Sequence, residues 1–62
     1  MIFLLRGKTY NLVPHQKEPS WLLVPSSEVQ DFREMGIPLT YLEEGRVVLM
    51  KSDLWKRLSQ GL

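Results

Sequence analysis

The 62-residue sequence contains no cysteine and a single histidine, His15. The lack of cysteine excludes disulfide bonds and cysteine-based zinc sites within this chain, and it is consistent with a reducing compartment such as the cytoplasm. A hydrolytic triad needs a nucleophile, a base and an orienting group within hydrogen-bond reach. His15 lies in a polar stretch between two prolines, so we expect a solvated loop histidine there. No cluster of carboxylates predicts a metal site.

Long hydrophobic runs and glycine-rich loops are also missing. The opening apolar run, residues 2–5, is too short to span a bilayer or to act as the hydrophobic region of a signal peptide. The four glycines are isolated from one another, so no glycine-rich loop is available to bind phosphate. We therefore expect a soluble, cytoplasmic protein that is not an enzyme, has no cofactor or small-molecule substrate and does not contact a membrane.

Length and composition indicate one small domain, residues 1–62. Hydrophobic residues make up 44% of the chain and charged residues 24%, which is typical of a globular domain. A domain of this size buries only about 60% of the surface of its unfolded chain, so oligomerisation or a ligand would add needed stability. The net charge is +1. Acidic residues are concentrated in residues 28–44, and the segments on either side carry an excess of lysine and arginine.

The C-terminal part, residues 37–62, holds the clearest local signals. Branched and aromatic residues around Glu44-Gly45 predict a hairpin over residues 39–50, because glycine supplies the positive φ that a two-residue loop needs. The alternative is a short helix over residues 38–44. Ser52 is a suitable N-cap for a closing helix that ends at Gly61. The apolar stripe of that helix comprises Leu54, Trp55, Leu58 and Leu62.

The N-terminal part predicts a hairpin, a strand and a helix. Gly7-Lys8 suits a type II′ turn within a hairpin over residues 2–13, pairing Leu5 with Tyr10 and Phe3 with Leu12. Residues 21–24 form a short apolar run that is consistent with a buried strand. Ser27 and Gln30 fit a capping box for a helix over residues 27–35, which ends at Gly36. The predicted fold is α+β, with the order β-β-β-α-β-β-α and a mainly antiparallel sheet.

The predicted strands carry more apolar surface than two short helices can cover. Antiparallel sheets usually alternate apolar and polar residues where one face meets water, and these strands do not. Large exposed apolar patches usually mark interfaces. The sequence therefore predicts a protein-binding module, such as a regulator, inhibitor or subunit of the kind that phages and mobile elements encode. Its partner is another protein or a second copy in a homodimer, and the interface candidates are Leu39, Tyr41, Val48, Met50 and Trp21.

A second hypothesis comes from the segment GRVVLMKSDLWKRL, residues 45–58. It resembles the tail of small winged helix-turn-helix proteins of the excisionase and MerR-like type, with residues 27–35 standing for the first helix of the motif. The resemblance implies a nucleic-acid-binding regulator that uses Lys51, Lys56, Arg57 and Arg46. Residues 37–44 depart from the pattern, because they are too short and too acidic for a recognition helix that presents basic or amide side chains to bases.

Overall fold

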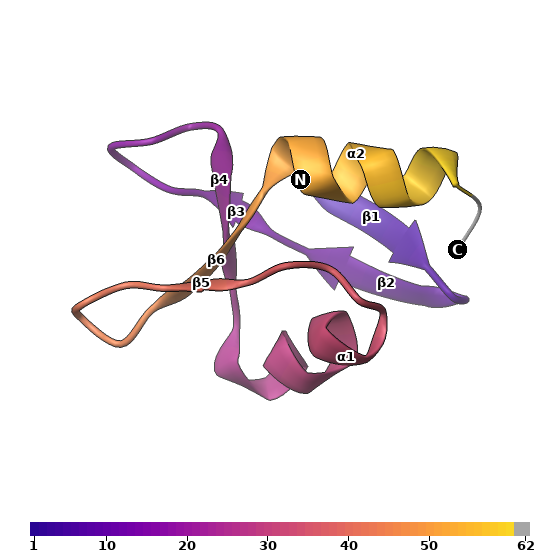
Figure 1. Ribbon diagram of the computed structural model, residues 1–62, viewed down its shortest axis with the longest axis horizontal. Helices are drawn as coiled ribbons and strands as arrows, with labels where there is room; N and C mark the ends of the chain where they lie inside the picture. Colours follow the sequence, from indigo (N-terminus) through magenta and orange to yellow (C-terminus); the bar gives the residue numbers. More distant parts are fainter. Residues whose placement is uncertain (61–62) are drawn as a thin grey trace.

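The computed structural model describes residues 1–60 and shows an α+β fold with two antiparallel sheets (Figure 1). β1 pairs with β2 in one sheet, and the second sheet has the strand order β3-β4-β6-β5. The predicted fold class and order of elements are confirmed. The bounds are β1 Ile2–Leu5, β2 Lys8–Asn11, β3 Val13–Pro14, β4 Trp21–Val24, α1 Val29–Glu34, β5 Thr40–Tyr41, β6 Val47–Met50 and α2 Lys51–Ser59, with a 3₁₀ turn at Ser26–Glu28 before α1.

The core lies between one face of the sheets and the two helices. Alternate residues of each strand point to opposite faces, and one set of them is buried together with Phe32 of α1 and Leu54 of α2. Both of those helical side chains are fully buried. We call this the inner face of the sheets. Its strand residues are Phe3, Leu5, Tyr10, Leu12, Leu22, Val24, Val47 and Leu49.

The first hairpin is present, but its register differs from the prediction by two residues. Leu5 pairs with Lys8 and Phe3 pairs with Tyr10, so the loop is Arg6-Gly7 and not Gly7-Lys8. Both loop residues have positive φ, 51° and 77°, as a type I′ turn requires. This register places the last paired backbone groups at Leu12, whose N–H donates to the Met1 carbonyl at 2.8 Å. The backbone pairing with β1 therefore ends at Leu12, and Pro14 lies in β3, where it pairs with Leu22.

The second hairpin is also present, and it removes the alternative of a short helix over residues 38–44. Its register differs from the prediction by one residue, because Thr40 pairs with Val48 and Tyr41 with Val47. The loop has three residues, 43–45, and ends at Gly45 with φ 85°. The Leu42 N–H donates to the Arg46 carbonyl at 2.7 Å. A turn followed by a left-handed glycine is the common geometry of three-residue loops.

The two helices end and begin differently from the predicted caps. α1 ends in a Schellman motif at Gly36, as predicted, with Ile37 N–H donating to the Phe32 carbonyl. The predicted start of α1 is wrong in detail, because a 3₁₀ turn precedes the helix and no side chain caps it. α2 begins at Lys51, one residue before the predicted cap Ser52, and it has no side-chain cap either. The predicted roles of Gly61 and Leu62 lie outside the described residues.

Candidate protein-binding face

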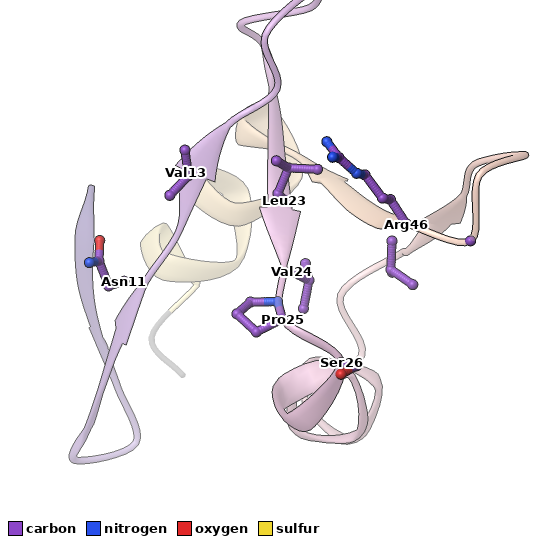
Figure 2. Close-up of a pocket in the computed structure, with 9 residues that line it drawn as sticks. Asn11, Val13, Leu23, Val24, Pro25, Ser26 and Arg46 are labelled. Carbon is purple, nitrogen blue, oxygen red and sulfur yellow. The ribbon is translucent and has the colours of Figure 1, made fainter.

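The second face of the sheets, here called the outer face, is not covered by α1 or α2. Both helices contribute their buried side chains to the core, so they lie on the inner side, and Figure 2 shows α2 behind the strands. Alternate residues of a strand face opposite sides, and paired residues of neighbouring strands face the same side, so the strand pairing identifies the residues of the outer face. They are Ile2, Leu4, Thr9, Asn11, Val13, Trp21, Leu23, Thr40, Val48 and Met50.

Apolar side chains dominate this outer face. Ile2 is 72% exposed and Leu4 is 68% exposed, the two highest values among the large exposed hydrophobic residues. On the other sheet, Val13 pairs with Leu23 and Leu23 pairs with Val48, so a row of apolar side chains crosses three strands. Val48 ends that row on β6, which lies between β4 and β5, and it is buried. The outer face therefore has a small packed centre with exposed apolar residues around it.

A groove of about 470 Å³ opens on this face where β2 and β4 separate (Figure 2). Val13 pairs with Leu23, and two residues further along the same register Asn11 would face Pro25. Pro25 has no N–H to donate, and its carbonyl accepts a hydrogen bond from the Glu28 N–H at 2.8 Å. The ladder therefore stops and the strands diverge. The lining residues are Asn11, Val13, Leu23, Val24, Pro25, Ser26, Gly45, Arg46 and Val47.

Arg46 places a cation at the rim of this groove. The residue is exposed, and Figure 2 shows it on the opposite side of Leu23 from Val13. Among residues 1–60, the one ion pair within 4.0 Å joins Lys8 and Asp31, so no described carboxylate lies within 4.0 Å of Arg46. The groove combines an apolar lining with a cation at its rim.

Three of the five predicted interface residues lie on the outer face. Trp21 pairs with Met50, and Val48 lies on the same side of the sheet. The other two do not join them, because the one-residue difference in register turns β5 over. Leu39 packs against the core. Tyr41 is exposed at the other face, where its hydroxyl contacts the guanidinium of Arg33.

The four basic residues proposed for nucleic-acid binding do not form one patch. Arg46 precedes β6 and Lys51 follows it, so they lie at opposite ends of that strand. Arg57 donates through Nε to the Met35 carbonyl at 2.9 Å, which ties it to the end of α1. Lys56 is exposed on α2. Residues 40–41 form β5, so the second helix of a helix-turn-helix motif is not present after α1.

Sequence reasoning missed a polar cluster that joins β2 to α1. Asp31 Oδ2 accepts hydrogen bonds from Lys8 Nζ and from the Tyr10 hydroxyl, both at 2.9 Å. These two hydrogen bonds hold the pKa of Asp31 below its ordinary value, and the bond from Lys8 has the larger effect. The same bond raises the pKa of Lys8, while burial raises that of Tyr10. These residues are far apart in sequence, so no local pattern indicates the cluster.

His15 is a structural residue of the loop between β3 and β4. Its Nδ1 accepts hydrogen bonds from the backbone N–H groups of Lys17 and Glu18, at 3.1 and 3.3 Å. The ring packs edge-on against Trp21, with centroids 5.5 Å apart. We expected a solvated histidine, but His15 is partly buried and shapes the loop beside the outer face.

Comparisons with protein-family models, with curated proteins and with solved structures find no match for this chain. Neither described helix has the length and apolar character that crossing a membrane requires. Within residues 1–60, histidine, aspartate and glutamate form no group of three that could hold a metal ion.

Proposed function

We propose that the protein is a small non-enzymatic binding module that acts by docking its outer face onto another protein. The observation that supports this most directly is the position of both helices on the inner face, which leaves the apolar outer face without a covering layer. Monomeric proteins rarely expose contiguous apolar patches beyond a few hundred Å², and larger ones usually mark interaction sites. A regulator, an inhibitor or a subunit of a larger assembly would use such a face.

The composition of the outer face fits a protein partner. Trp21 and Met50 are paired across two strands, and aromatic residues, methionine and arginine are enriched at the centres of protein interfaces. Asn11 and Arg46 supply polar groups at the rim of the groove. A homodimer is the case in which the partner is a second copy of the chain. A cytoplasmic location completes the proposal and rests on the sequence alone.

The test replaces exposed outer-face residues by lysine and measures association of the intact protein. Val13→Lys and Met50→Lys change side chains that are 57% and 44% exposed, so both variants should fold. Gln30→Lys on the exposed side of α1 is the matched control. Light scattering across a concentration series reports self-association, and capture from the native host followed by reconstitution with the purified partner reports hetero-association.

We expect both outer-face variants to lose association while the control keeps it. Folded outer-face variants that associate as wild type does would contradict the proposal. A wild-type protein that stays monomeric at every concentration and captures no partner would contradict it as well.

The alternative of a nucleic-acid-binding regulator stays a prediction with its own test. Binding that depends on phosphate contacts weakens steeply as salt rises, because neutralised phosphates release counterions. Lys56→Glu combined with Arg57→Glu should abolish such binding. A nanomolar, salt-sensitive complex with duplex DNA would favour this alternative over the binding module.

A further inference from the structure

We propose that a second copy of the chain pairs with the free edge of β1, so that the two β1 strands run antiparallel across a two-fold axis at Phe3. The proposal rests on the proposed function, because Ile2 and Leu4 belong to the outer face, and it names the partner for that part of the face. Three features of the edge support it: unpaired backbone groups, a lack of protecting residues and a ring of exposed apolar side chains.

The unpaired backbone groups of this edge belong to Ile2 and Leu4. In an antiparallel ladder, residues alternate between those that bond to the paired strand and those whose N–H and C=O point away from it. Met1 is of the first kind, because its carbonyl accepts from the Leu12 N–H at 2.8 Å and its amino group donates to the Leu12 carbonyl at 2.9 Å. Phe3 therefore also bonds to β2, and the backbone groups of Ile2 and Leu4 point outward. Within the part of the chain that the structure describes, β1 pairs with β2 alone, and it lies at the left margin of Figure 2.

β1 lacks the features that protect edge strands from pairing with another chain. Natural edges are protected by charged side chains, proline, bulges or short length. The other edge strands of the described sheets follow this rule, since β2 carries Lys8, β3 contains Pro14 and β5 has two residues. β1 has four residues, none of them charged, and it pairs with β2 without a bulge. Among the described edges, β1 is therefore the one most open to a further strand.

Exposed apolar side chains gather around the same edge. Four of the seven large hydrophobic side chains that are exposed lie on β1 or beside it, namely Met1, Ile2, Leu4 and Trp55. Trp55 reaches β1 from α2 and packs edge-on against Phe3, with ring centroids 5.7 Å apart. At about 200 Å² for each large side chain, the exposed fractions amount to roughly 450 Å² per copy. Two copies with their backbone edges would thus bury about 1,000 Å², which is the area of a weak, reversible dimer.

A second copy satisfies this edge because the edge is symmetric about Phe3. In antiparallel pairing centred there, Ile2 bonds with the partner subunit's Leu4 and Leu4 bonds with the partner subunit's Ile2, which makes four backbone hydrogen bonds. These apolar side chains then lie in contact on the outer face, since residues directly opposite share a side. On the inner side, Phe3 meets the partner subunit's Phe3 with a Trp55 ring on either flank. The pairing ends at Arg6, where a φ of 51° turns the chain away.

The experiment measures amide hydrogen exchange of the full chain by NMR at rising protein concentration, together with sedimentation equilibrium. We expect the amides of Ile2 and Leu4 to exchange more slowly as the concentration rises from about 50 μM to about 2 mM, the range in which a weak dimer forms. The amide of Phe3 is bonded within each copy and should stay protected throughout. Slower exchange confined to Ile2 and Leu4 would distinguish edge pairing from a dimer formed through the rest of the outer face.

Two proline variants test the backbone bonds directly. Leu4→Pro removes the outward N–H and leaves the hydrogen bonds to β2 in place. It should weaken dimerisation at least about tenfold, because each copy loses one intersubunit hydrogen bond and one apolar side chain. Thr9→Pro is the matched control, since Thr9 is paired opposite Leu4 and its N–H also points out of the hairpin. If a proline variant unfolds, Leu4→Lys and Thr9→Lys replace the pair, because both side chains are exposed.

Three results would overturn the pairing of β1. They are a monomer at about 2 mM, a dimer in which the Ile2 and Leu4 amides exchange at the same rate at every concentration, and a folded Leu4 variant that dimerises as wild type does.

Val13 and Met50 are not on β1, so Val13→Lys and Met50→Lys report on the remaining outer face. If they abolish capture of another protein while β1 does not pair, the proposed binding function stands and the β1 assignment alone fails. If β1 pairs but both variants capture the other protein as wild type does, the binding function fails and the β1 assignment stands.

Discussion

The two faces of the same strands differ in burial, although both carry mainly apolar residues. In β4 and β6, Leu22 and Leu49 point to the inner face and are fully buried, whereas the neighbouring Trp21 and Met50 point outward. Trp21 is partly buried and Met50 is 44% exposed. The difference does not come from the residue types. It comes mainly from the position of the two helices, which both pack on the inner side. Val48 is the exception, since it lies on the outer face and is 1% exposed.

The largest effect should come from removing a helical side chain that covers the inner face. Phe32 is fully buried and packs on Tyr10, with ring centroids 4.9 Å apart. Phe32→Ala should destabilise the protein by about 3–5 kcal/mol, which is enough to unfold much of a chain this small. Leu4→Ala on the outer face is the control and should change stability by less than about 0.5 kcal/mol. Thermal unfolding followed by circular dichroism checks both variants. Equal losses of stability would show that the inner and outer faces do not differ in their contribution to the fold.

A smaller effect on stability should distinguish the packed centre of the outer face from the exposed residues around it. Val48 and Val13 occupy the same row of that face, but Val48 is 1% exposed and Val13 is 57% exposed. Val48→Thr buries a hydroxyl and should destabilise by about 1–3 kcal/mol, whereas Val13→Thr should be close to neutral. Urea unfolding of the two variants measures the difference. A neutral Val48→Thr would mean that the centre of the outer face is open to water.

The polar cluster between β2 and α1 should contribute a pH-dependent effect. Folding lowers the pKa of Asp31. The contribution of its carboxylate to stability is therefore present above the ordinary pKa of about 3.9 and is lost as the pH falls through the pKa in the folded protein. Asp31→Asn should flatten this loss of melting temperature below about pH 4. Glu34→Gln on the exposed side of α1 is the control, and it should retain the wild-type pH dependence.

The smallest effect on stability is expected at the most exposed position. Ile2→Lys should leave the melting temperature within experimental error, because the side chain is 72% exposed. If the outer face carries the association, the same variant should weaken it at low ionic strength. A variant that unfolds would show that Ile2 is covered in the native assembly.

The two hairpins explain how much of the fold the sequence could predict. Both predicted registers were wrong, yet the error of two residues in the first hairpin left Phe3 and Tyr10 on the buried face. The error of one residue in the second hairpin exchanged the faces of β5. Local turn signals locate a hairpin, but they do not distinguish a two-residue loop from a three-residue loop ending in the same glycine.

The candidate site was predictable only where strand periodicity was enough. Trp21, Val48 and Met50 share a face because alternation within β4 and β6 places them there. The groove was not predictable, since Asn11, Pro25 and Arg46 come together through pairing between distant segments. Serine caps also failed, because neither helix uses Ser27 or Ser52 as a side-chain cap.

The pairing of β4 with β6 has a kinetic consequence. It joins residues 21–24 to residues 47–50 across a segment that contains α1 and β5, whereas each hairpin forms between chain neighbours. Closing such a segment loses chain entropy before its contacts compensate, and nonlocal pairing of this kind slows folding. We therefore expect the β4–β6 ladder to form late and to limit the folding rate. Leu23 meets Val48 in that same step, so a nascent or partly folded chain does not yet present the docking surface.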